Sequence, residues 1–182
     1  MEVIFLLVLP AALWAQAWYF LGLYTNPRTL GIISGTVAIT LVGLVAFGPE
    51  SFNPVVVGSA SALGAFVLLW AIYAALVAAV ALWGFDERTL GFYALFLWVV
   101  SLLFTGYYFM GGTLLASGGT AGVQSAIMGI ATLLLTVVAA LVFFYLGPPF
   151  ARMRQAAGWF ELILSITIAM LGGLAVLGLP LN

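Results

Sequence analysis

Long apolar stretches fill most of the chain, and short segments rich in polar residues, proline or glycine separate them. A helix needs about 20 apolar residues to cross the hydrocarbon core of a bilayer, so each stretch is long enough for one crossing. The stretches are apolar on every face, whereas the strands of a membrane barrel alternate apolar and polar positions. The pattern predicts an all-α membrane protein with six transmembrane helices, at residues 3–24, 30–47, 55–83, 89–110, 122–146 and 157–179.

The composition agrees with this pattern. The 182 residues are 66% hydrophobic and 5% charged, and they include no histidine, cysteine or lysine. A soluble domain carries about 25% charged residues, so this chain lacks the polar side chains for a water-facing surface. We therefore expect residues 1–182 to form a single transmembrane domain whose main partner is the lipid bilayer.

The four basic residues all fall in the predicted loops after the first, third and fifth helices, at Arg28, Arg88, Arg152 and Arg154. Cytoplasmic loops of membrane proteins carry an excess of arginine and lysine. The arginine loops are therefore predicted to be cytoplasmic, and both chain termini are predicted to lie outside.

The tetrapeptide Arg-Thr-Leu-Gly occurs twice, at residues 28–31 and 88–91, and the third arginine loop keeps Arg154 ahead of Gly158. Each copy follows one predicted helix and begins the next. One interpretation is that any such turn favours a base, a capping residue and a small residue. The other is a true repeat, and it predicts three two-helix hairpins around a central pore, at about residues 1–50, 51–112 and 113–182.

The turn residues of the first two hairpins predict where the following helices begin. Asn26-Pro27 and Asp86-Glu87 are expected to end one helix and supply turn or cap chemistry for the next. Thr29 and Thr89 are expected to be the N-caps themselves.

Two strongly polar side chains within the predicted helices are candidate functional groups. Glu161 is the one acidic residue inside a predicted span, and ionisable groups within a membrane are costly and usually functional. It either anchors the helix end beside Arg152 or Arg154, or acts in a pore or gate. Gln16 either ties two helices together or lines a wet path, because a buried amide needs partners.

The aromatic residues leave two interpretations open as well. Trp14 and Trp70 lie deep within predicted helices, where they either face lipid and core or form the walls of a narrow pore. The chain offers no nucleophile with a base, no metal-ligand cluster and no phosphate loop, so we expect neither an enzyme nor a bound metal or cofactor. Four scattered arginines also exclude nucleic-acid binding.

Three segments are similar to the urea and short-chain amide channels of bacteria, the AmiS/UreI family. They are GLYTNPRT at residues 22–29, IYAALVAAVALWGFDERTLGFYALFLWV at residues 72–99, and AGWFELILS at residues 157–165. The resemblance implies a hexamer in the bacterial inner membrane, with one passive pore per protomer for a small neutral solute. By this resemblance Tyr73 falls on a pore tyrosine, with Leu69 one turn before it, and Glu161 lies near a pore glutamate of some members.

The chain also departs from that family. The family's fifth helix carries several tryptophans, and here Gly129, Thr132 and Thr136 occupy that region. The histidines of acid-gated members are absent too, which argues against gating of that type. The candidate pore-lining residues are Trp14, Gln16, Leu69, Trp70, Tyr73, Thr132 and Glu161.

Two alternatives remain beside the passive channel. Acetate/succinate uptake proteins carry an Asn-Pro-x-Pro-x-Gly signature, and residues 26–31 resemble it except that Thr29 replaces the second proline. A monocarboxylate transporter is therefore the second hypothesis. An accessory subunit of a larger membrane complex is the third, because the chain has few polar residues for a pore.

Overall fold

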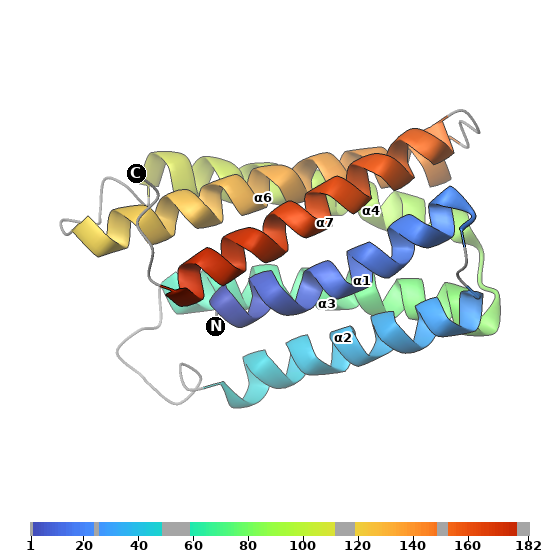
Figure 1. Cartoon of the computed structure of the whole chain (residues 1–182), viewed down its shortest axis with the longest axis horizontal. Helices are drawn as coiled ribbons and strands as arrows, with labels where there is room; N and C mark the ends of the chain where they lie inside the picture. The colour runs from blue at the N-terminus through green and yellow to red at the C-terminus, as the bar shows by residue number, and fades with distance from the viewer. Residues whose placement is uncertain (1, 24–25, 49–58, 112–118, 149–152, 178–182) are drawn as a thin grey trace.

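The computed structural model of the chain describes residues 2–23, 26–48, 59–111, 119–148 and 153–177. All regular structure within these ranges is helical (Figure 1). The elements are α1 (Glu2–Leu21), α2 (Pro27–Phe47), α3 (Ser59–Trp83), α4 (Glu87–Gly106), the short π-helix η2 (Tyr107–Gly111), α6 (Gly119–Leu146) and α7 (Met153–Leu177).

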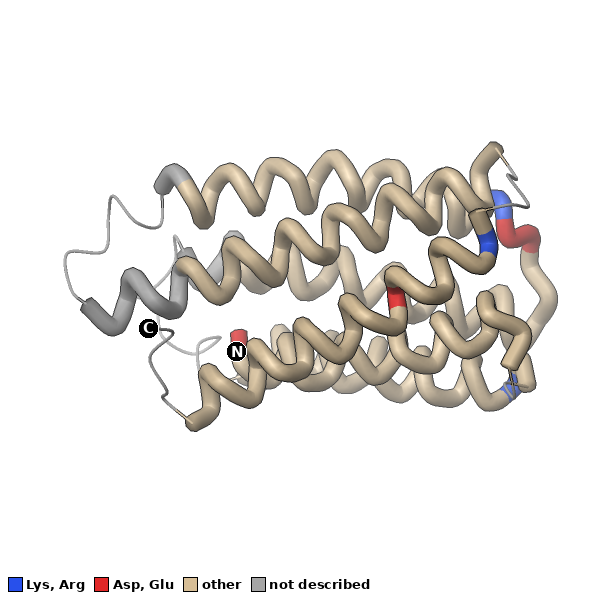
Figure 2. The backbone as a smooth tube through the Cα atoms, turned by 45° about the horizontal axis from the view of Figure 1, so that its top comes forward, with Lys and Arg blue, Asp and Glu red and all other residues tan. Residues whose placement is uncertain are grey.

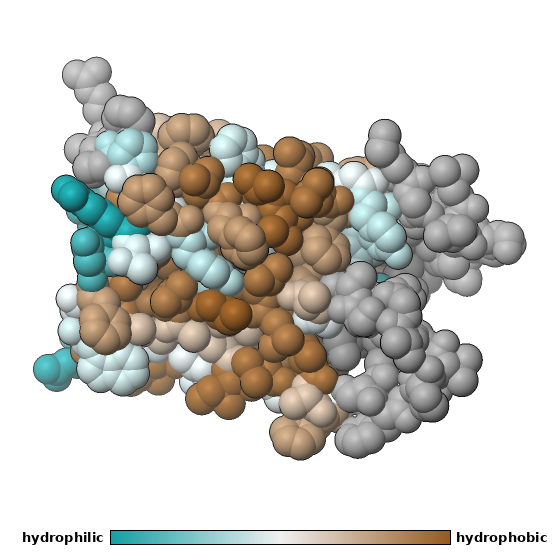
Figure 3. Space-filling view, turned by 180° about the vertical axis from the view of Figure 1, so that it is seen from behind, coloured by the Kyte–Doolittle hydropathy of each residue, from teal (hydrophilic) through white to brown (hydrophobic). Residues whose placement is uncertain are grey.

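Within the described ranges, six helices are long and apolar enough to cross a membrane, which confirms the predicted all-helical class. A helix of 21 residues, such as α2, is about 32 Å long and matches the hydrocarbon thickness of a bilayer. Figure 3 shows large apolar side chains covering one side of the bundle. Ile39 and Phe47 are 76% and 79% exposed, as expected for a surface that faces lipid rather than water.

Contacts between the helices follow a closed circuit. The most extensive packing joins α1 with α7, α4 with α6, and α2 with α3. Less extensive packing joins α1 with α2, α3 with α4, and α6 with α7. Tight and loose neighbours therefore alternate around the circuit, and the loose pairs are those that the arginine loops connect.

The starts of α2 and α4 share one capping arrangement. Asn26 and Asp86 are the N-caps, and the side-chain oxygen of each accepts a hydrogen bond of 2.9 Å from the backbone N–H of the arginine two residues later. The prediction that Thr29 and Thr89 cap these helices is therefore wrong, since both lie inside the first turn. The expected capping role of the residues before them is confirmed.

Three glycines allow the tightest helix contacts. A Cβ atom added at Gly31 in α2 would lie 2.5 Å from the Leu82 side chain of α3. One added at Gly91 in α4 would lie 2.5 Å from the backbone nitrogen of Gly147, just after α6. One added at Gly158 in α7 would lie 2.9 Å from the Leu21 side chain of α1. Each glycine begins one helix of a tightly packed pair and contacts the end of the other.

The basic residues gather at one end of the bundle, which we call the arginine end (Figure 2). Arg28, Arg88 and Arg154 lie there, and Arg152 is outside the described residues. Arg154 donates hydrogen bonds to the backbone carbonyls of Phe20, at 2.9 Å, and Tyr19, at 3.3 Å. These carbonyls belong to the last turn of α1, where a cation is favourable. Arg154 thereby joins the start of the last helix to the end of the first.

Candidate functional site

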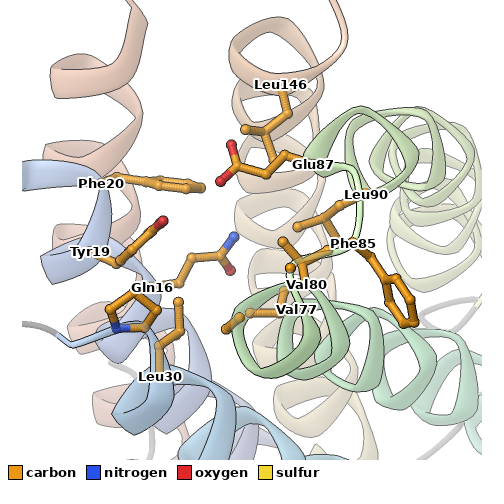
Figure 4. A pocket seen from close by; sticks show the side chains of 13 residues that line it. Gln16, Tyr19, Phe20, Leu30, Val77, Val80, Phe85, Glu87, Leu90 and Leu146 are labelled. Atoms are coloured by element: carbon orange, nitrogen blue, oxygen red, sulfur yellow. The ribbon is translucent and has the colours of Figure 1, made fainter.

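A cavity of about 320 Å³ opens between the helices at the arginine end. Its walls come from α1, α2, α3, α4 and α6 and from the turn at Gly84 and Phe85. Most lining side chains are apolar, and the polar ones are Gln16, Tyr19 and Glu87. Figure 4 shows the amide of Gln16 and the carboxylate of Glu87 directed into the cavity from different helices. A cavity of this kind fits a small polar solute.

Gln16 and Tyr73 connect two helices across the interior of the bundle. Gln16 is 2% exposed and lies on α1, one turn before the end of the helix that Arg154 holds. The Tyr73 hydroxyl of α3 donates a hydrogen bond of 2.9 Å to Gln16 Oε1. This bond fixes the orientation of the amide, because the accepting atom must be the oxygen. The Gln16 amide nitrogen is consequently the atom that points into the cavity (Figure 4).

Glu161 is buried beside this pair. It lies eight residues after Met153, about 12 Å along α7, and is 2% exposed. Its carboxyl group is close enough to the Tyr73 hydroxyl for an electrostatic interaction. Neither carboxyl oxygen has a hydrogen-bond partner within the described part of the chain. One interpretation places Glu161 beside Arg152 or Arg154. The Arg154 guanidinium binds the carbonyls of α1 instead, and Arg152 lies outside the described residues.

Trp70 and its neighbours form a buried aromatic cluster on the other side of Tyr73. The rings of Trp70 and Tyr73 contact each other edge to face, with centroids 5.4 Å apart. Phe66 packs on Trp70, Phe5 and Phe104, and all but Phe104 are fully buried. The Trp70 indole N–H also lacks a hydrogen-bond partner among the described residues. The interior is therefore polar at the end of the cavity and aromatic beyond it.

The remaining predicted site residues are placed elsewhere. Trp14 is 41% exposed and packs edge to face on Trp18, so the structure does not bring it to the polar cluster. The Thr132 hydroxyl is buried and donates to the Gly129 carbonyl at 3.0 Å, within its own helix. Leu69 is partly buried, and its carbonyl accepts a hydrogen bond of 2.9 Å from the Tyr93 hydroxyl.

Sequence reasoning did not single out two polar residues of the cavity, Glu87 and Tyr19. Glu87 follows the N-cap Asp86 directly, so its position in a turn favoured a structural explanation. Tyr19 lies three residues after Gln16 and therefore on a neighbouring part of the same face of α1. The three-residue spacing from Gln16 was the feature of the sequence that could have identified Tyr19.

The composition and the six helices of the described residues that are long and apolar enough to cross a membrane indicate a multi-pass membrane protein. No protein-family model, curated protein or solved structure matches the chain.

Proposed function

We propose that the chain is a passive channel for urea or short-chain amides, whose path follows the interior of the six-helix circuit. The observation that carries this proposal is the cavity at the arginine end, which leads to the buried Gln16–Tyr73 pair. A neutral amide has a carbonyl oxygen that accepts hydrogen bonds and N–H groups that donate them. The amide nitrogen of Gln16 is a donor for that carbonyl.

Unpartnered polar groups around Tyr73 support the same solute class. The Trp70 indole N–H and the Glu161 carboxyl each lack a partner in the described residues. A buried polar group without a hydrogen bond costs about 1–3 kcal/mol, so a passing solute with both donor and acceptor atoms would relieve that cost. An anion would find no basic side chain among the described residues that line the cavity.

The repeat contributes to the proposal through the three glycine contacts. Gly31, Gly91 and Gly158 each contact the end of the neighbouring helix in a tight pair, as three related hairpins around an axis would require. We accordingly propose three repeated hairpins around one central path, with the arginine end in the cytoplasm and both termini outside. We also propose that the protein is a homo-hexamer in the bacterial inner membrane. This part of the proposal rests on the family resemblance.

The test is stopped-flow swelling of proteoliposomes that contain the purified full chain. Urea, acetamide and acetate are applied in turn, and empty vesicles of the same lipid are the control. We expect urea or acetamide permeability above that of empty vesicles. The flux should rise linearly with solute concentration and should not depend on a proton gradient. Permeability equal to that of empty vesicles, from folded protein, would reject the channel and favour the accessory subunit. Purification together with other chains would favour that subunit as well.

Glu161 favours one second candidate, a proton-coupled monocarboxylate transporter. A buried carboxyl group without a partner is a natural proton carrier, because it is expensive to keep charged. Acetate uptake that requires a proton gradient, and that Glu161→Gln abolishes, would establish this function. Amide flux that persists in Glu161→Gln vesicles would exclude a required proton step.

A further inference from the structure

The cavity at the arginine end contains one acidic side chain that the proposed pathway does not yet use. Glu87 is the charged residue of its lining, and its carboxylate points into the cavity toward the side that carries Gln16 and Phe20 (Figure 4). None of the three arginines that the structure describes lines the cavity. Arg154 binds the carbonyls of Tyr19 and Phe20. Arg88 lines a neighbouring hollow, and Glu87 lines that hollow as well as the cavity.

Helix stability alone does not account for Glu87. An acidic residue in the first turn of a helix contributes about 0.3–1 kcal/mol through the helix dipole. In α2 the position after the N-cap is occupied by Pro27, which also lines the cavity. Two helices with the same cap geometry therefore begin with proline in one case and glutamate in the other, so the cap itself does not require an acid at this position.

Electrostatic contacts agree with this placement. Glu87 lies within electrostatic range of the hydroxyl groups of Tyr19 and Tyr145, on two other helices. The Glu87 side chain is exposed, so its carboxylate lies at the open mouth of the cavity. A carboxylate at such a mouth attracts N–H donors and cations and repels anions.

We propose that Glu87 is the specificity-determining residue of the inner mouth, where it selects solutes rich in N–H groups and rejects carboxylates. This inference rests on the proposed channel function and names the solute chemistry at one end of its path. The Glu87 carboxylate accepts N–H bonds from the solute, and the Gln16 amide nitrogen is available for a carbonyl oxygen. Urea, primary amides and guanidinium fit the carboxylate, and acetate does not.

Guanidinium is the probe for this site, because it binds a carboxylate with two parallel N–H···O bonds. Its binding to the purified full chain is measured by calorimetry at constant ionic strength, in the wild type and in Glu87→Gln. We expect the affinity of Glu87→Gln to be about tenfold lower, since charge-assisted hydrogen bonds are about twice as strong as neutral ones. Tetramethylammonium, which has the charge but no N–H donor, is expected to bind more weakly than guanidinium.

Asp86→Asn is the matched control. It removes the same charge one residue away, keeps an N-cap of equal quality, and lies outside the cavity lining. We expect its guanidinium affinity to stay within about twofold of the wild type, because Asp86 does not line the cavity and a charge outside it is screened by salt. Equal losses in both variants would reduce the effect to general surface charge and overturn the proposal. An absence of guanidinium binding to the wild type would overturn it too.

Flux separates this inference from the channel function. In the wild type, guanidinium on the arginine side is expected to inhibit urea flux, and Glu87→Gln is expected to relieve the inhibition. If vesicles with folded wild-type protein pass no urea while guanidinium still binds through Glu87, the channel proposal fails and the binding site stands. If urea passes and guanidinium binding does not depend on Glu87, the channel stands and the inference fails.

Discussion

The half of the bundle near the arginine end and the half near the opposite end fill their interiors differently. Near the arginine end, a cavity of about 320 Å³ reaches Gln16 between mainly apolar walls. Toward the opposite end, Phe66 packs on Phe5 and on Trp70, and all three rings are fully buried; we call this the aromatic half. Both halves are built from the same helices, so the difference comes from side chains and not from the fold.

Tyr73 lies at the boundary between these halves. Its ring contacts Trp70 of the aromatic half, and its hydroxyl binds Gln16 at the end of the cavity. On the proposed path, a solute would pass from this polar contact to the aromatic cluster. The cavity and the aromatic cluster are made by different side chains. Variants can therefore change one of them without changing the other.

The largest expected loss of stability comes from a substitution in the aromatic half. Phe66→Ala removes a fully buried ring that packs on Phe5 and Phe104, and such truncations cost about 3–5 kcal/mol. We expect a large loss of thermal stability in detergent, and urea permeability above the wild type in vesicles of folded protein. Phe92→Ala, on a residue that is 62% exposed, is the control and is expected to change both values little. Equal losses of stability and equal permeabilities in the two variants would show that the aromatic cluster has no special role.

The tight contact at the arginine end gives the next effect. Gly91→Ala brings a methyl group to within 2.5 Å of the Gly147 backbone nitrogen, and a backbone atom cannot turn aside. We expect a destabilisation of about 1–3 kcal/mol, measured by unfolding in detergent. Gly35→Ala is the matched control, because its methyl group would contact Ala78 Cβ at an ordinary 3.6 Å. A Gly91→Ala protein as stable as Gly35→Ala would show that α4 and α6 separate easily.

Tyr73→Phe tests the boundary between the halves. The change removes the hydrogen bond to Gln16 and keeps the ring contact with Trp70, so we expect a stability loss of about 1 kcal/mol. Urea flux is expected to change as well, because the Gln16 amide is no longer held in one orientation. Tyr93→Phe removes one hydrogen bond, to the Leu69 carbonyl, and is expected to leave flux unchanged. Identical flux in both variants would remove Tyr73 from the path.

Glu161→Gln is expected to have the smallest effect on stability. The carboxyl oxygens have no partner among the described residues, so an uncharged amide of similar shape breaks no hydrogen bond that the structure contains. We expect a change below about 0.5 kcal/mol in unfolding free energy, well under the usual cost of losing a buried hydrogen bond. A loss of several kcal/mol would mean that Glu161 is a structural anion with a partner in the membrane.

The positions of the helices could be predicted from the sequence because apolar length alone identifies a membrane span. The exact helix starts could not, since asparagine, aspartate and threonine all cap helices well. In α2, Pro27 directly after Asn26 was the deciding signal, because proline is favoured at the first helical position. Thr29 had to lie inside that helix.

The candidate site was predictable in part for similar reasons. Trp14 and Gln16 are two residues apart, and residues at that spacing point to different sides of a helix. Only one of them could face the interior, and the structure buries Gln16. The bond between Gln16 and Tyr73 joins residues 57 positions apart, and such a pairing depends on how the helices pack, which no local pattern contains.

The hydrogen bonds from Arg154 to the last turn of α1 have a consequence for how the protein is made. Helix α1 has its most extensive contacts with α7, which follows it by more than 130 residues. During synthesis, the helices between them are therefore made before α1 can pack on α7. The α1–α7 contact forms after those helices are made, and Arg154 forms hydrogen bonds across it.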